Sequence, residues 1–426
     1  MNKIIFIMIL CYCFVISKEN GLDYTADRLE GFNNNFGQGR RLIGNVNMWQ
    51  DSIFIECDSA IYYFNSNIAE LMGRVKVHQD SLTVFSEKMI YNGNTKITNS
   101  PAKIKIVDRE TILEGDKGTY NSIFKKAIFS GNVLIDDDTS RIYCNRLIHH
   151  RIDEVSYTYG DVFLWGKNEN VYLKADTIEN YGKSKITFSY GNPELFLIDT
   201  TDNMKLDTLS IISKRMEAYR EIDDTKFYFF DSVEIYREKI RGKSDSLFVY
   251  EKEELTYLLG SSVIFYDNSQ LFGDSINIFM NGTKLSRIKA VNNSISVSIE
   301  DSVFISRKNQ MSGDTISIDF EDQKVNGMFA KGKSKLLHFI MNEDKNPDGA
   351  NVCSSENIDI LFEENEATDM NFFKGKNGGE SPEVKTLPEF MTQGKEKDFY
   401  LPSFKWDVSP PLKKKLIYPQ KKIIAE

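Results

Sequence analysis

The 426-residue sequence predicts an all-β fold built from tandem strand units. A short motif returns every 29 residues along the first part of the chain. Apolar residues alternate with polar ones at fixed offsets from this motif, and a period of two is typical of strands with one buried face. Phe and Tyr number 29 and 20 against only 9 prolines, a composition that also favours strands.

The repeated motif is a Gly-x-Val triplet or a close variant of it. It occurs as Gly44-Asn45-Val46, Gly73-Arg74-Val75, Ala102-Lys103-Ile104, Gly131-Asn132-Val133 and Gly160-Asp161-Val162. Beyond these units the spacing loosens, and the sequence predicts further ones at Leu195, Val233, Val263 and Val303. No single unit can bury its apolar face alone, so we expect the units to stack around one continuous interior.

A second anchor lies about twelve residues after the first in each unit. It is an acidic or polar residue followed by a short polar residue and an apolar one, as in Asp58-Ser59-Ala60 and Asp245-Ser246-Leu247. The residue before it is nearly always small, which predicts a bend or a narrowing of the interior. Cys57 and Cys144 occupy this position, three units apart, and we expect both to be reduced and buried.

Alternation fixes two faces of each strand, and we assign the interior to the face that carries the anchors. The predicted interior residues are the anchors, their second neighbours and the residues three places before the acid. They are Val46, Met48, Ile55, Val75, Val77, Val84, Ile104, Ile106, Leu113, Val133, Ile135, Ile142, Val162, Leu164 and Leu173.

The two ends of the chain differ from the repeat. Residues 1–17 carry Lys3, then thirteen mostly apolar residues and a polar run, which predicts an export signal peptide. This stretch is too short for a membrane span, which needs roughly 20 residues. We expect two repeat segments, 40–192 and 193–373, and a Pro- and Lys-rich tail, 374–426, whose segment 401–411 could dock on the repeat or on a partner.

Charge and composition exclude several classes of function. The net charge of −9 leaves no fold-wide basic surface, so nucleic acid is not expected as a partner. The five cysteines form no Cys-x-x-Cys pair and the four histidines are scattered, so neither a metal site nor a cofactor is expected.

The recurring acids raise the alternative of an enzyme, because glycoside hydrolysis needs a pair of carboxylates. However, a catalytic pair should occur once and break the repeat, whereas these acids occupy one equivalent position in most units. We therefore expect no enzyme.

One repeat position is occupied by an aromatic residue in four successive units: Tyr62, Tyr91, Tyr120 and then His149. These side chains could pack against one another across strands or form a ladder that contacts lipid or sugar, and cross-strand aromatic packing is favoured.

The tandem pattern resembles the OstA-like and LptA-like family, the periplasmic domain of the lipopolysaccharide-transport (Lpt) machinery. The resemblance rests on Gly-x-Val, the alternating strand and an Ala-Asp or Ser-Asp step, as in Gly73-Arg74-Val75 to Tyr91 and Ala175-Asp176-Thr177. It implies an elongated, folded-over β-jellyroll of antiparallel strands with an apolar groove between two sheets. It also implies lipopolysaccharide acyl chains in that groove, and edge-to-edge pairing with other Lpt-type jellyroll domains.

Together these features predict an exported, non-catalytic lipid-binding protein of the periplasm, either free there or associated with the outer membrane. It would carry or bridge lipopolysaccharide, or a related amphipathic glycolipid, between membranes for outer-membrane assembly. We expect head-group contacts from Arg40, Arg41, Arg74 and Lys76 at the rim of the groove. The alternative is a cell-surface β-solenoid adhesin or scaffold with a filled interior; the lack of a convincing cap before Leu42 slightly favours the bridge.

Overall fold

The computed structural model describes residues 21–34, 37–167, 170–200, 206–221, 224–237, 240–282, 284–299, 303–322, 324–363, 366–375 and 381–418. The predicted signal peptide, 1–17, lies outside these residues. The chain divides into two compact units, residues 1–133 (unit 1) and 134–426 (unit 2). No helix in the described ranges is long and apolar enough to cross a membrane.

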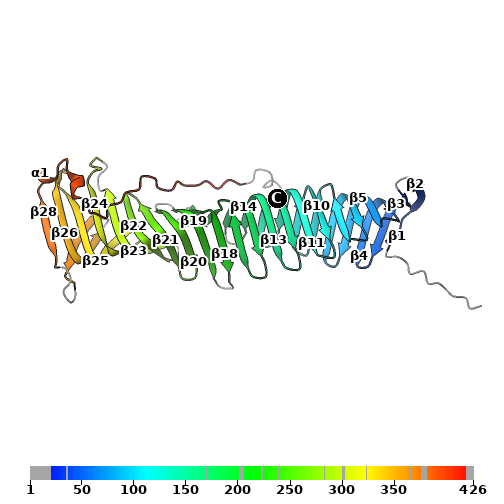
Figure 1. The fold of residues 1–426 in the computed structure, drawn as a ribbon, viewed down its shortest axis with the longest axis horizontal. Coiled ribbons are helices and arrows are strands. Elements are labelled where there is room, and N and C mark those ends of the chain that lie inside the picture. Colours follow the sequence, from blue (N-terminus) through cyan, green and yellow to red (C-terminus); the bar gives the residue numbers. More distant parts are fainter. Residues whose placement is uncertain are drawn as a thin grey trace, which may run out of the picture. The chain divides into compact units, whose positions relative to one another are not determined.

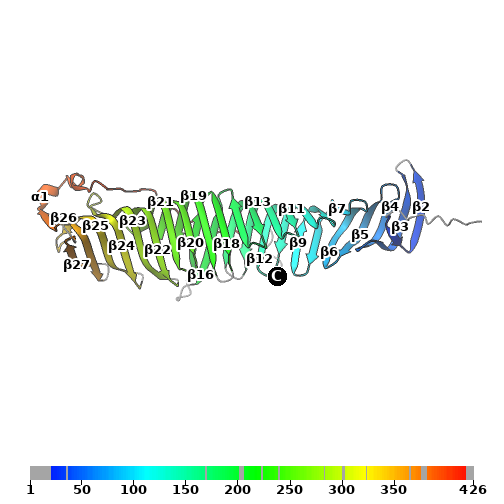
Figure 2. The same cartoon turned by 60° about the horizontal axis from the view of Figure 1, so that its bottom comes forward.

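Unit 1 consists of short and long strands that follow one another in sequence order (Figure 1; Figure 2). They are β1 (Asp23–Thr25), β2 (Arg28–Asn34), β3 (Gly37–Gln50), β4 (Ile53–Tyr63), β5 (Ile68–Gln79), β6 (Leu82–Asn92), β7 (Ile97–Ser100), β8 (Ile104–Asp108), β9 (Thr111–Gly115), β10 (Lys117–Asn121) and β11 (Lys126–Asp136), whose last residues belong to unit 2.

Unit 2 continues with the same kind of strands and ends in two short helices. The strands are β12 (Ser140–His150), β13 (Val155–Gly166), β14 (Val171–Tyr181), β15 (Ile186–Tyr190), β16 (Glu194–Thr200), β17 (Leu206–Ile212), β18 (Arg215–Arg220), β19 (Thr225–Arg237), β20 (Ile240–Tyr250), β21 (Leu255–Tyr266), β22 (Ser269–Asn281), β23 (Lys284–Ile299), β24 (Lys308–Glu321), β25 (Lys324–Met341), β26 (Pro347–Glu363), β27 (Glu366–Phe373) and β28 (Glu383–Leu387). The helices are α1 (Glu389–Thr392) and a 3₁₀ turn (Glu396–Phe399).

A β-bulge lies near the middle of every second long strand, such as β3, β5, β13 and β21, and at this level the strands bend into two halves. In β5 the bulge is Gly73-Arg74, with φ angles of 77° and 46°, and the register with both neighbouring strands shifts close to it. A Cβ atom on Gly73 would collide with the Asp58 carboxylate, which accepts hydrogen bonds from Arg74 Nε (3.0 Å) and Nη2 (2.6 Å). The Gly-x-Val motif therefore marks a bulge, and the positive φ and the nearby acid favour glycine at its first position.

The same contact between an acid or its amide and a glycine recurs in both units. The pairs are Asp27 with Gly44, Asp116 with Gly131, Asn145 with Gly160, Asp176 with Gly191, Asp245 with Gly260, and Asp314 with Gly332. Asn132 donates to Asp116 at 2.7 Å, as Arg74 does to Asp58. The recurring acids thus hold the bulges, which is the structural role that their fixed repeat position predicts.

The interior register differs from the prediction in the last part of unit 2. The bulge there is Gly260-Ser261, so Ile264 lies on the interior face, opposite Gly242 and Leu271. The predicted anchor Val263 lies on the outer face, and the predicted anchor Val303 is 76% exposed and outside any strand. The prediction for Val263 is wrong because both faces of its strand are apolar, and alternation alone cannot choose between them. The prediction for Val303 is wrong because this residue lies before β24 and belongs to no strand.

The outer face of this region is covered by the chain's own C-terminal segment, residues 400–418, here called the strap. Phe404 and Trp406 pack against a patch on β21, β22 and β23, whose members are Val263, Phe265, Phe272, Ile295 and Val297. Gln270 and Asp407 exchange two hydrogen bonds of 2.8 Å, and Lys243 pairs with the Asp407 carboxylate at 2.8 Å. Figure 1 shows the strap running back from α1 along the strands.

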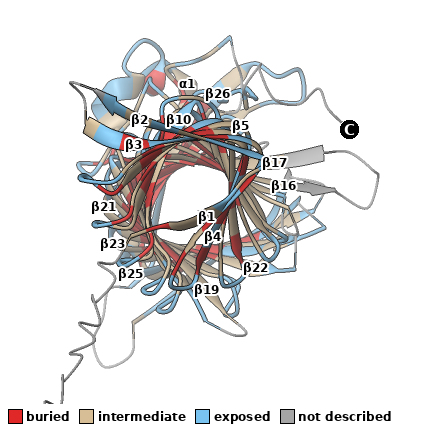
Figure 3. Ribbon diagram, turned by 90° about the vertical axis from the view of Figure 1, so that its right-hand side faces the viewer, coloured by how far each residue is buried: buried red, intermediate tan, exposed pale blue. Residues whose placement is uncertain are grey.

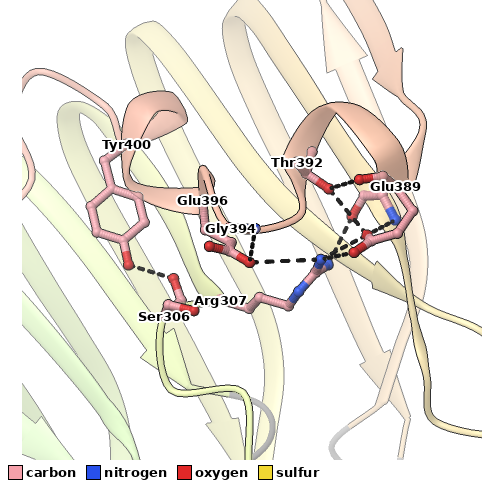
Figure 4. A network of polar contacts seen from close by, with 8 residues as sticks. Ser306, Arg307, Glu389, Thr392, Gly394, Glu396 and Tyr400 are labelled. Atoms are coloured by element: carbon pink, nitrogen blue, oxygen red, sulfur yellow. Dashed lines mark hydrogen bonds and ion pairs between the residues drawn. The ribbon is translucent and has the colours of Figure 1, made fainter.

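A buried ion pair anchors α1, which precedes the strap (Figure 4). The Arg307 side chain, 5% exposed, donates through Nη2 to both carboxylate oxygens of Glu389 at 2.6 Å, and Glu396 lies 4.0 Å away. Tyr400 donates to the carbonyl of Ser306. A buried guanidinium needs such a partner, so α1 and the start of the strap are fixed to unit 2.

Candidate functional site

The candidate site is the apolar interior between the two halves of the bent strands. Thirteen of the fifteen predicted interior residues are buried, with exposures of 0 to 8%; Ile142 and Leu164 are half-buried. Figure 3 shows buried residues on the strands and exposed ones mainly at the turns. Burial of the thirteen residues fits the assignment to the interior, while lipid contact by these residues stays a prediction.

Strand pairing places the predicted residues of unit 1 side by side on one wall. The register runs Met48, Ile55, Val77, Val84, Ile106 and Leu113 across six consecutive half-strands. In unit 2 it brings Ile142, Leu164 and Leu173 together in the same way. This row therefore forms a continuous aliphatic wall in unit 1, and the row at the start of unit 2 is aliphatic too.

The facing wall was missed by the sequence reasoning. In unit 1 it carries Leu42, Ala60, Leu71 and Met89 in one register row, with exposures of 0 to 1%. A signal for this wall was present, because Ala60 is the apolar residue that follows the acid Asp58 at a distance of two. The half-strands on the other side of the bulges therefore also turn an apolar face inward, so both walls contribute to the interior.

The repeated tyrosines belong to this second wall. Tyr62, Tyr91 and Tyr120 are 4%, 0% and 2% exposed, and the register places Ala69 and Thr98 on either side of Tyr91. Rings therefore alternate with small side chains, and the expected cross-strand aromatic packing is wrong for Tyr91. Burial raises the pKa of Tyr91 well above its ordinary value.

Two rows of turns meet at the edge of unit 1 that lies away from the bulges, and we call this line of contact the seam. Lys96 Nζ pairs with Asp51 at 2.8 Å, and one repeat later Lys125 Nζ pairs with Asp80 at 2.9 Å. Beneath the first pair the Tyr91 hydroxyl donates to Gln50 Oε1 at 3.3 Å. The seam thus closes the interior opposite the bulges.

Of the four basic residues expected at the rim, only Arg40 shares the interior face, where it alternates with Leu42 and lies 5.7 Å from the Tyr24 ring centroid. Arg74 lies at a bulge and pairs with Asp58. The hydrogen bond from the Arg74 guanidinium holds the pKa of the Asp58 carboxyl below its ordinary value. Lys76 lies on the outer face, 3.7 Å from Glu56. The cations at the seam are instead Lys96 and Lys125.

The buried cysteines match the prediction for the small repeat position. Cys57, Cys144 and Cys353 are free and buried. Burial raises the pKa of Cys57 to about 11, so its thiol stays protonated at neutral pH and is a poor nucleophile. Within the described ranges no group of three His, Cys, Asp or Glu side chains could hold a metal ion.

These features define a class: an all-β repeat protein whose antiparallel strands fold over an apolar interior. The model of OstA-like proteins matches residues 24–140, and the model described as LptA/(LptD N-terminal domain) LPS transport protein matches residues 112–284. The chain belongs to this OstA- and LptA-like family of lipopolysaccharide-transport proteins, as the repeat predicted.

Among solved structures, the chain is similar to LptH, the LptA-homologous periplasmic component of the lipopolysaccharide transport device of Pseudomonas aeruginosa. The identity is 14%, the match covers 35% of this chain and 93% of that one, and the TM-score is 0.27. A similarity this low supports no inference about the present chain. No curated protein matches the sequence.

Proposed function

We propose that this protein is an exported, non-catalytic carrier that bridges membranes in the periplasm and holds the acyl chains of lipopolysaccharide, or of a related glycolipid, in its interior. The observation that supports this is the unbroken aliphatic wall from Met48 to Leu113, faced by a second apolar wall. Burial of a methylene group yields about 0.8 kcal/mol, so ten methylenes would contribute roughly 8 kcal/mol before the costs of binding.

The interior is closed in the described state, and this bears on how a lipid would enter. The wall residues Val75, Val84 and Leu71 are 0 to 1% exposed, so neither water nor an acyl chain reaches them from outside. An acyl chain can take its place only if the walls part. The seam is the natural place for this, because the bulges on the opposite edge are continuous backbone.

Bridging by edge-to-edge pairing is supported by the strands at the ends of the described chain. β27 and β28 each pair with β26, and β1 and β2 each pair with β3. The end strands are short, and Glu383 and Lys385 on β28 are exposed. Short, charged edge strands limit uncontrolled aggregation. The N–H and C=O groups on the free side of these strands would form hydrogen bonds with an edge strand of another jellyroll domain.

The proposal is tested by extracting the chain, purified from the periplasm of its own host, and identifying bound lipid by mass spectrometry. We expect stoichiometric acylated glycolipid in the native chain and its loss in Val75→Asp, which places a charge on the aliphatic wall. Lys76→Asp is the matched control, because the neighbouring residue faces outward on the same strand. Equal lipid in Val75→Asp and the native chain, with both folded, would refute the interior as the lipid site.

The second candidate function is a scaffold with a permanently filled interior. The near-zero exposure of the wall residues favours it. A lipid-free chain that resists proteolysis and takes up no acylated glycolipid would support the scaffold and reject the carrier.

A further inference from the structure

We infer that the seam of unit 1 is an exchange site for anions, in which Lys96 and Lys125 release Asp51 and Asp80 and bind the phosphate groups of the amphiphile whose acyl chains occupy the interior. This inference rests on the proposed function and adds to it the chemistry of the head group. The ligand class is a phosphate-bearing amphiphile with long acyl chains.

The two partners of each ion pair differ in how far the protein covers them. The side chains of Lys96 and Lys125 are only 16% and 19% exposed, whereas those of Asp51 and Asp80 are 73% and 57% exposed. A carboxylate that already lies mostly in water loses little when it leaves, since surface ion pairs contribute about 0 to 1 kcal/mol. The ammonium groups stay at the seam, where an incoming phosphate can replace the carboxylate.

The spacing of the two lysines also suits an extended head group. Lys96 ends the turn between β6 and β7, and Lys125 ends the turn between β10 and β11. Because β7 pairs with β10, the two turns are two strand spacings apart, or about 10 Å. Two cations at this distance can bind two phosphate groups of one head group.

The chemistry changes sharply from the seam to the interior. Tyr91 and Gln50, which are hydrogen-bonded to each other, lie beneath the first ion pair and are 0% and 5% exposed. Further inside lie buried aliphatic residues of unit 1, such as Leu71 and Met89. Charge at the surface over buried hydrocarbon is the arrangement that an anionic lipid requires.

Anion exchange would also open the seam. The ion pairs join the two rows of turns, so binding of phosphate by the lysines removes the bonds that hold the walls together. The alternative is that the ion pairs only hold the two rows of turns together. In that case, loss of Asp51 and Asp80 would weaken lipid binding. An exchange site would instead bind phosphate more tightly without these acids, because the carboxylates no longer compete for the lysines.

The experiment measures transfer of dipalmitoyl phosphatidic acid, or of dipalmitoylglycerol with the same acyl chains, from phosphatidylcholine vesicles to the full chain. We expect roughly tenfold tighter binding of the phosphatidic acid, which corresponds to about 1.4 kcal/mol. The double variant Lys96→Gln, Lys125→Gln should lose this preference and keep its affinity for dipalmitoylglycerol. Lys105→Gln is the matched control, because Lys105 pairs with Glu114 at 3.3 Å on the outer face of unit 1.

The double variant Asp51→Asn, Asp80→Asn should bind phosphatidic acid more tightly than the native chain. Equal affinity of the native chain for both lipids, or weaker binding of phosphatidic acid by the Asn variant, would overturn the inference and leave the carrier proposal intact. No binding of either lipid would refute the carrier proposal itself. Inorganic phosphate that binds the lysines as tightly as phosphatidic acid does would also overturn the inference, because the acyl chains would then play no part.

Discussion

Unit 1 and the last part of unit 2 share the same bulged repeat, but the residues on the inner and outer faces of their strands differ. In unit 1 the interior residues beside the bulges are Val46 and Val75, and the outer face carries ion pairs such as Lys76 with Glu56. In unit 2 the corresponding interior residues become Ser262 and Ser294, and the outer face is apolar. The repeat constrains the bulge and the alternation of faces, but it leaves the chemistry of each face free to change.

The difference in the outer faces explains why only unit 2 needs a third layer. An exposed patch of five aliphatic and aromatic side chains on a sheet is an aggregation hazard. The strap covers this patch with Phe404 and Trp406, and Lys308 lies 4.8 Å from the Trp406 ring centroid. The outer face of unit 1 instead carries ion pairs, such as Lys76 with Glu56 and Lys105 with Glu114.

The largest effect is expected from Glu389→Ala, which removes the carboxylate that pairs with the buried Arg307. Loss of one partner leaves an uncompensated buried charge, so we expect the free energy of unfolding to fall by about 3 kcal/mol. Urea denaturation measures it. Glu383→Ala, at an exposed acid on β28, serves as the control. An equal effect of the two variants would show that the Arg307–Glu389 ion pair does not anchor α1 and the strap.

A smaller loss is expected when the strap loses its central aromatic residue. Trp406→Ala should lower the free energy of unfolding by about 2 kcal/mol, since this side chain is only partly buried against the apolar patch. Hydrogen exchange should also become faster at the amide of Asp407, which donates to Gln270. Val408→Ala, at an 85% exposed side chain, is the control. Unchanged exchange in Trp406→Ala would mean that the patch does not hold the strap.

Replacement of the bulge glycine should lower the free energy of unfolding equally in both units, because the bulge is the feature that they share. Gly73→Ala in unit 1 and Gly332→Ala in unit 2 each place a Cβ at positive φ against an acid, Asp58 or Asp314. We expect each to cost about 1 to 2 kcal/mol of unfolding free energy. Gly31→Ala, with no atom within 4 Å of the new Cβ, is the control. A cost in one unit only would show that the two bulges are not equivalent.

The smallest effect concerns the pH dependence of the strap. Burial of the Asp407 carboxyl raises its pKa, but hydrogen bonds from Lys243 and Ser409 outweigh burial and leave the pKa below its ordinary value of 3.8. The stabilisation is therefore complete above pH 3.8 and is lost as the pH falls through the lowered pKa. In a Trp49→Phe, Trp165→Phe background, Trp406 fluorescence should report this release. Asp407→Asn should make docking independent of pH in this range, and an unchanged pH profile would contradict the assignment.

The sequence predicted unit 1 far better than the end of unit 2, for a physical reason. Where one face is apolar and the other charged, as at Val75 and Lys76, alternation identifies the buried face. At Val263 and Ile264 both faces are apolar, because one faces the interior and the other the strap. Which of the two faces is the interior one then depends on contacts between residues far apart in sequence, and a local sequence pattern does not contain this information.

The candidate site was predicted on one wall only, for a similar reason. The anchors after the bulge, such as Val46 and Met48, repeat with a conspicuous motif, whereas the second wall has small or aromatic residues such as Ala69 and Tyr91. The seam was not predicted, since Lys96 and Asp51 are 45 residues apart and meet only when the strands bend. The division of the repeat at residues 192 and 193 remains a prediction.

The central claim is that acyl chains lie between the two walls of unit 1, and a lipid with a photoreactive diazirine in its acyl chain tests it most directly. After illumination of the loaded full chain, mass spectrometry identifies the labelled residues. We expect labels on Val75, Val77 and Leu71, and none on Lys76 of the same strand. Labels on Lys76, or labels spread equally over both faces, would contradict the account.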